Sequence, residues 1–138
     1  MSFDADFRRF LIDDPGVGEI IGDRLYPLVL PQGCILPAAT YQEISGTRDH
    51  TMDGPSGIAS LRVQITTFAV EKKLAKELAN RIRLALDGAY GLLGAGTSVQ
   101  RIELLDAHDE YDSVVTVHSA VLDFEIEMEE PVRWAREA

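Results

Sequence analysis

The sequence predicts an α+β fold: a mostly antiparallel sheet of about four strands, packed by one long helix, with one or two short N-terminal helices. Apolar and polar residues alternate along residues 61–68, which is typical of a strand with one covered face. Residues 71–87 instead carry leucine or isoleucine at every fourth position, the pattern of an amphipathic helix. The length of 138 residues fits one domain, 1–138, with residues from about 129 to 138 as a C-terminal extension.

Two short helices are predicted near the N-terminus. Phenylalanine and leucine recur at helical spacing over residues 4–12. A second helix begins after Asp14, which suits the N-cap, and Pro15 suits the first helical position. Gly22 can adopt the left-handed conformation that ends this helix.

The first strands are predicted on either side of a long hairpin loop. Three prolines within residues 26–37 favour an edge segment or a loop there, because proline donates no backbone hydrogen bond. Residues 38–45 and 61–68 follow as strands, joined by the stretch SGTRDHTMDGPSG, residues 45–57. This loop exceeds the roughly two to five residues that reverse a chain in a hairpin, so its length requires an explanation.

The last strands are predicted at residues 98–105 and at about 113–128. The far half of the second strand alternates apolar residues with acidic ones. Its near half, residues 113–121, is apolar on both faces, so a second cover is needed there. Either another subunit or the two N-terminal helices would supply that cover.

The net charge of −10 restricts the partners of the chain. Ten carboxylates and no lysine or arginine lie between Glu103 and Glu130, so specific binding to DNA or RNA is not expected. Acidic and basic residues are mixed along 71–87, which indicates either a solvated helix face or an interface with acid from another copy. We expect no secretory leader and no membrane span, and Cys34, the only cysteine, leaves no partner for an intrachain disulfide.

The stretch 45–57 contains the residue types of a catalytic or metal loop. His50 and Asp53 lack the spacing of a helical zinc motif, and Ser45 lies in no nucleophile elbow. Residues 106–112, DAHDEYD, lack the glycine and distal glutamate of a calcium loop and are predicted to form a hydrated acidic turn. We therefore expect no enzyme and no cofactor. Two alternatives stay open: a small metal-dependent hydrolase that uses both stretches, and a monomeric protein-binding adaptor.

The order of segments carries a family resemblance. Residues 22–57, GDRLYPLVLPQGCILPAATYQEISGTRDHTMDGPSG, are followed by LRVQITTF, a long helix and a closing VLDFEIEMEE. This order resembles the tail-completion, or tail-terminator, protein family of long-tailed phages and phage-derived gene transfer agents. The resemblance covers roughly residues 8 to 128. It implies an α+β subunit that forms a ring, six-fold by analogy, on the head-proximal end of the tail tube.

The implied ring stops tube polymerisation and presents the surface to which the head connector docks. Its partners would be further copies of the chain, the tail tube protein and the connector, and DNA would pass through without specific binding. The location would be the virion, after synthesis in the host cytoplasm. We predict that the 45–57 loop is an assembly arm, mobile alone and ordered on contact. The candidate interface residues are Tyr41, Arg48, Asp49, His50, Met52, Asp53 and, in the C-terminal extension, Trp134.

Overall fold

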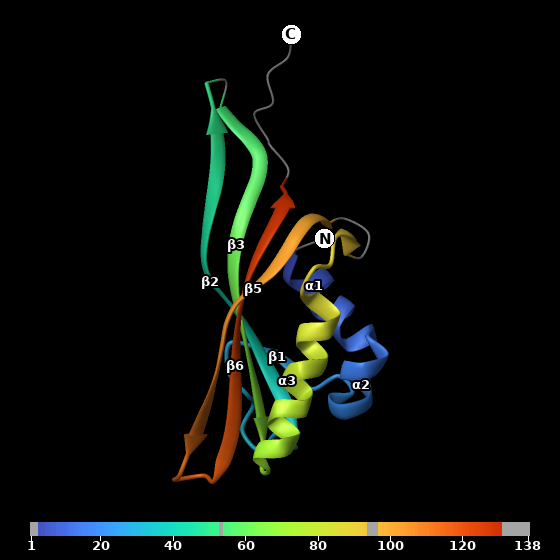
Figure 1. Cartoon of the computed structure of the whole chain (residues 1–138), viewed down its shortest axis with the longest axis vertical. Helices are drawn as coiled ribbons and strands as arrows, with labels where there is room; N and C mark the ends of the chain where they lie inside the picture. Colours follow the sequence, from blue (N-terminus) through green and yellow to red (C-terminus); the bar gives the residue numbers. More distant parts are fainter. Residues whose placement is uncertain (1–2, 53, 94–96, 131–138) are drawn as a thin grey trace.

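The computed structural model describes residues 3–52, 54–93 and 97–130. Within these residues a six-stranded sheet has the strand order β1-β2-β3-β6-β5-β4, and three helices pack on one of its faces (Figure 1). This arrangement confirms the predicted α+β class. No helix in the described ranges is long and apolar enough to cross a membrane.

Both predicted N-terminal helices are present, as α1 (Phe3–Asp13) and α2 (Pro15–Ile21). Asp14 caps α2, since its side-chain oxygen accepts a hydrogen bond from the backbone N–H of Val17 at 3.1 Å. Gly22 follows with φ of 60°, a backbone conformation that residues with a side chain rarely adopt.

Four long strands form the middle of the sheet: β2 (Ala38–Thr51), β3 (Gly54–Ala69), β5 (Thr97–Asp112) and β6 (Val117–Glu129). They pair in antiparallel fashion, as predicted. The predicted number of strands is too low, because β1 (Leu25–Pro27) and β4 (Gly91–Leu93) add one short strand beside each outer long strand. Strands of three residues in proline-rich or glycine-rich segments are too short for alternation to reveal them.

The stretch 45–57 was predicted as a loop, and this is wrong for most of its length. It continues β2 and β3 as a paired ladder, from Ser45 opposite Arg62 to Thr51 opposite Gly54. Register shifts interrupt the pairing of β2 with β3 at two points, between Glu43 and Ser45 and between Arg48 and His50. Gly54, with φ of 118°, supplies the conformation needed at the tight turn.

The second predicted turn is also strand. Residues 106–112 belong to β5, and the chain reverses at residues 113–116, which were predicted as strand. The acidic side chains are compatible with strand structure here because both faces of this part of β5 are exposed to water. The turn therefore lies at residues 113–116, directly after the acidic segment that was predicted to form it.

The core lies between the sheet and α3 (Lys72–Leu86), whose bounds agree with the predicted helix to within one residue at each end. Its buried side chains Leu78, Ile82 and Leu86 join one cluster with Ile65 and Phe124 of the sheet. Burying each such side chain contributes about 1.5 to 3 kcal/mol. Residues of α1 and α2 belong to the same cluster, so the N-terminal helices cover the same sheet face as α3 rather than the second face of β6.

Two hairpins extend past the helices at opposite ends of the molecule (Figure 1). The β2–β3 hairpin projects at the upper end in this view, and the β5–β6 hairpin projects at the lower end. The sheet is therefore staggered: the β2–β3 hairpin extends it at one end and the β5–β6 hairpin extends it at the other.

Candidate assembly surfaces

The outer part of the β2–β3 hairpin is an exposed arm, which we define as residues 43–58. β1 pairs only with residues 39–41 of β2, so over residues 43–50 the outer edge of β2 has no strand beside it in the part of the chain that the structure describes. Backbone N–H and C=O groups along such an edge can pair with a strand of another chain.

Several predicted interface residues lie on this arm. Arg48, Asp49 and His50 are exposed on β2, and Met52 is fully exposed at the turn. The His50 Nδ1 atom lies 3.2 Å from the backbone oxygen of Arg48. Asp53 lies outside the described residues. Contacts of these side chains with other subunits stay a prediction.

Tyr41 and Trp134 differ from the rest of the predicted set. Tyr41 is buried, its ring centroid lies 6.0 Å from that of Phe7, and burial raises the pKa of its hydroxyl. The structure thus places Tyr41 in the core, below the arm. Trp134 lies outside the described residues.

Arg48 binds a carboxylate of its own chain. Its Nε and Nη2 atoms donate to Glu130 Oε1 and Oε2 at 2.9 and 2.8 Å, a two-pronged geometry that suits guanidinium and carboxylate. The hydrogen bond from Arg48 is the main cause of a lowered pKa for Glu130. The backbone N–H of Glu130 also donates to Gly57 O at 2.7 Å. This pair ties the end of β6 to the base of the arm, and Arg48 would have to exchange partners to bind across an interface.

The geometry argues against a hydrolase that combines the two polar stretches. His50 lies on the β2–β3 arm and residues 106–112 lie on the β5–β6 hairpin, at opposite ends of the sheet (Figure 1). Among the described residues, no group of three or more His, Cys, Asp and Glu side chains is arranged to hold a metal ion. One chain therefore cannot bring the two stretches into a shared site.

The β5–β6 hairpin is a second arm, defined as residues 106–118, and it is acidic. β4 pairs only with residues 97–99 of β5, so the outer edge of β5 within this arm also lacks a neighbouring strand among the described residues. His108 is flanked by two carboxylates, and its hydrogen bond to Glu110, followed by that to Asp106, raises its pKa. The arm thus carries negative charge and an open edge together.

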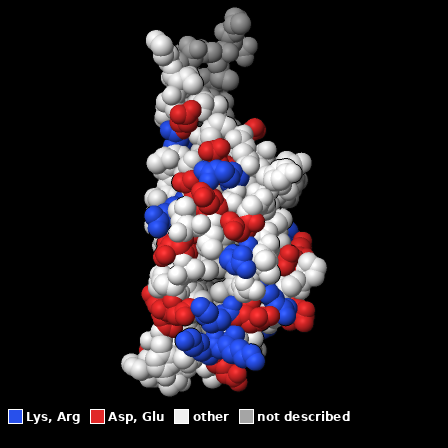
Figure 2. Space-filling view, in the orientation of Figure 1, with Lys and Arg blue, Asp and Glu red and all other residues white. Residues whose placement is uncertain are grey.

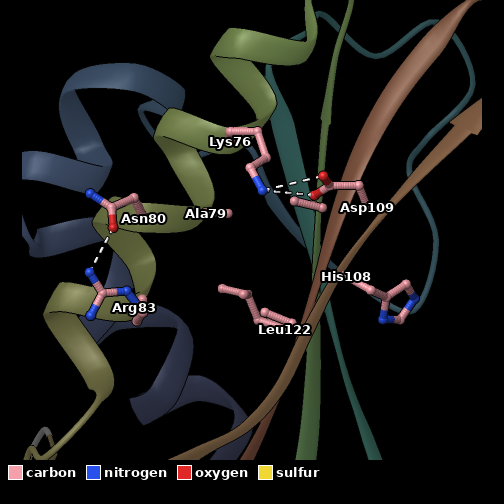
Figure 3. A pocket seen from close by; sticks show the side chains of 9 residues that line it. Lys76, Ala79, Asn80, Arg83, His108, Asp109 and Leu122 are labelled. Carbon is pink, nitrogen blue, oxygen red and sulfur yellow. Dashed lines mark hydrogen bonds and ion pairs between the residues drawn. The ribbon is translucent and has the colours of Figure 1, made fainter.

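A groove separates α3 from β5 (Figure 3). Its volume is about 240 Å³, and its apolar lining includes Ala79 and Leu122. Lys76 Nζ lies 3.2 Å from both oxygens of Asp109 across the groove. Arg83 donates to the neutral Asn80 Oδ1 at 2.7 Å and makes no ion pair with any described residue. The groove is therefore bridged at one point and open elsewhere.

The helix-free face of the sheet holds a polar network that the sequence did not reveal. Arg62 and Gln64 of β3 donate to the two oxygens of Asp123 at 3.0 Å each. Arg101 of β5 binds Glu103 and Glu125, both at 2.7 Å. Apart from Arg101 and Glu103, which both lie on β5, the partners come from different strands, and the sheet register identifies them.

These surfaces are consistent with a protein that assembles through its sheet edges, and comparison with known proteins identifies its family. Residues 5–129 match the family described as "Tail completion protein gp17". The chain belongs to the tail completion family. No curated protein sequence matches it.

A solved structure has the same fold as this tail completion protein. One chain of the structure described as "Virion of native gene transfer agent (GTA) particle" aligns with a TM-score of 0.76 and 19% sequence identity. The alignment covers 93% of this chain and 95% of the other. Together with the family, this supports a structural role in the tail of a phage or gene transfer agent. The predicted resemblance is confirmed.

Proposed function

We propose that this tail completion protein forms a closed ring, hexameric by analogy with the family it belongs to, at the head-proximal end of the tail tube. There the ring ends polymerisation of the tube and presents the surface to which the head connector docks. Its partners are further copies of itself, the tube protein and the connector.

The observation that carries the ring is the pair of open edges on opposite sides of one sheet. Beyond the short strands β1 and β4, the outer edges of β2 and β5 are unpaired within the described residues, and they lie at opposite ends (Figure 1). A contact between two different edges is heterologous, and heterologous contacts close into rings when the rotation between copies allows it. Two copies that met through the same edge would leave the other edge unused.

The charge of the protein suits a passage for DNA. A net charge of −10 disfavours adhesion of the phosphate backbone, so DNA can move through the ring without being held.

The rival adaptor function needs only a monomer. Multi-angle light scattering of the purified protein at raised concentration distinguishes the two, because a ring has a several-fold larger mass.

Deletion of the coding sequence from the particle-producing genome tests the proposed role. We expect heads and tails that remain unjoined, with tubes longer than normal, because nothing caps the growing end. Restoration by the intact chain supplied from a second copy is the control. Particles of normal length and normal delivery of DNA from the deletion strain would overturn the proposal.

A further inference from the structure

The outer edge of the sheet at β1 and β2 has a step. β1 lies beside residues 39–41 of β2, and a hydrogen bond from Leu28 N to Tyr41 O at 3.0 Å marks the end of this added strand. Beyond it, toward the arm, β2 alone forms the edge, and a register shift leaves Ile44 opposite no residue of β3. Leu28 and Ile44 lie on the two sides of the step and are 62% and 45% exposed.

The opposite edge, at β4 and β5, has a step of the same kind. β4 lies beside residues 97–99 of β5. The chain before β4 follows β5 as far as Leu104, whose backbone N–H donates to Asp87 Oδ1 at 3.0 Å. Beyond Leu104, β5 alone forms the edge, and a register shift leaves Leu105 opposite no residue of β6. Leu105 is 44% exposed.

The two steps lie at the same height along the strands. Val63 of β3 marks this height, because it pairs with Glu43 of β2 and with Phe124 of β6, and Phe124 pairs in turn with Leu104 of β5. In the orientation of Figure 1, β1 widens the sheet below this height and the segment 87–93 widens it above. One edge therefore projects where the other is recessed, so the edges of two copies can fit together.

Rotation of a copy about an axis along the strands preserves these heights. It brings the recess at Leu105 of one copy to the projecting Leu28 of the next. Because neighbouring strands twist by roughly 20° to 25°, the two outer edges can approach each other only over a short stretch. The steps provide a short stretch with apolar side chains on both edges, and burial of such side chains favours association.

Charge disfavours contact between two β5 edges. Beyond its step this edge carries four carboxylates, from Asp106, Asp109, Glu110 and Asp112. Lys76 pairs with Asp109, and His108 lies between Asp106 and Glu110, so an excess of negative charge remains. Figure 2 shows acidic side chains gathered over the lower part of the sheet. Two such edges would repel each other.

The β1 edge has no such excess of charge. Arg8 donates to the backbone oxygens of Leu25 and Asp23 at 2.9 and 2.8 Å, so its guanidinium lies along β1. Two arginines and two aspartates lie near this edge: Arg8, Arg24, Asp4 and Asp23. The acidic β5 edge can therefore approach the β1 edge of another copy more easily than a second β5 edge.

We propose that the recess at Leu105 of one copy receives Leu28 of a neighbouring copy, while the segment 87–93 of the first copy enters the recess beside Ile44 of the second. This contact rests on the proposed ring and specifies its subunit interface. It is heterologous, since each copy uses one edge toward each neighbour. The short strands β1 and β4 thus determine the height at which neighbouring copies meet.

Disulfide trapping tests the contact. On a Cys34→Ser background, Leu28→Cys and Leu105→Cys are prepared as separate proteins, mixed, and oxidised. Because a disulfide requires Cα atoms within about 7 Å, a linked dimer should form only in the mixture. One chain that carries both substitutions should give a ladder of linked multimers that ends at the closed ring. The matched control replaces Leu105→Cys with Leu84→Cys, since Leu84 is 65% exposed on α3, and this mixture should stay unlinked.

A second measurement follows the strength of self-association. Leu105→Asp should weaken it by about tenfold or more, because the contact would then bury a carboxylate in place of an apolar side chain. Leu84→Asp should leave it unchanged. Urea unfolding of both variants shows that the fold itself is retained. Ile44→Asp should act in the same direction, and its combination with Leu105→Asp should weaken association by less than the product of the two effects, because both remove one contact.

The outcomes separate this contact from the ring itself. Rings that form without a 28–105 bond, or that tolerate Leu105→Asp, would overturn the contact and leave the proposed function intact. A bond formed by Leu105→Cys alone would show a two-fold contact and also overturn it. A strictly monomeric chain under all conditions would overturn both.

Discussion

Asp6 is a buried carboxylate whose partner lies 91 residues away in sequence. The Thr97 hydroxyl donates to Asp6 Oδ2 at 2.7 Å, and both residues are buried between α1 and the start of β5. Thr97→Val keeps the shape of the side chain and removes the donor, which leaves the carboxylate unsatisfied. We expect a loss of about 1 to 3 kcal/mol in the free energy of unfolding, measured with urea.

Two further variants make this expectation specific. Thr97→Ser restores a hydroxyl and should recover most of the lost stability. Thr66→Val, on the helix-free face of β3, should cost much less. If Thr97→Val is as stable as the parent chain, the hydrogen bond to Asp6 contributes nothing and the assignment is wrong.

The pair between Arg48 and Glu130 predicts a dependence of stability on pH. Glu130 has a folded pKa below its ordinary value of 4.5, so the pair stabilises the fold above that pH and is lost as pH falls through the folded pKa. Both side chains are partly exposed, which limits the contribution to under about 1 kcal/mol. The difference in unfolding free energy between the parent and Arg48→Ala should therefore be present at neutral pH and vanish in acid.

The control for this prediction is Arg9→Ala. Arg9 Nη1 and Asp13 Oδ1 are 3.9 Å apart and both side chains are well exposed, so loss of this ion pair should change stability little at any pH. A difference for Arg48→Ala that persists unchanged into strong acid would show that Arg48 acts through packing rather than through its charge.

At the scale of elements, local patterns predicted α3 well and the hairpin ends poorly. The leucine stripe of α3 is contained in one segment, so its bounds follow from the sequence to within a residue. Residues 45–57 contain several glycines, a proline and mixed charges, which are typical of loops, but pairing with the opposite strand determines their conformation. The arm was located correctly as an exposed segment, whereas the partner of Arg48, 82 residues distant, is defined only by the fold.

The β2–β3 arm should differ from the sheet centre in its dynamics. Backbone amides on the open edge of residues 43–50 lack a neighbouring strand, whereas β3 over residues 61–67 pairs on both sides. In the free subunit, hydrogen exchange measured by mass spectrometry should therefore be fast in the arm and slow in the centre. Assembly should slow exchange in the arm and leave exchange in the sheet centre unchanged. Equal exchange of the arm before and after assembly would exclude it from the interface.

For the whole molecule, the fold class and the family followed from the order of segments, while the surfaces did not. A cavity lined by Leu36, Pro37 and Leu74 forms where the β1–β2 connector meets the first turn of α3, and these two segments are about 35 residues apart in sequence. The two overhanging edges likewise depend on the strand order, which places β6 between β3 and β5. Periodic patterns along the chain do not predict which distant segments meet, so the assembly surfaces are defined only by the three-dimensional structure.

The central claim is that the protein forms a ring at the junction of head and tail. Electron microscopy of particles that carry a gold-labelled tag on this chain tests it most directly, with untagged particles as the control for background. The account predicts label at the head-proximal end of each tail, on one ring per particle. Label distributed along the tube, gathered at the distal tip, or absent from purified particles would contradict it.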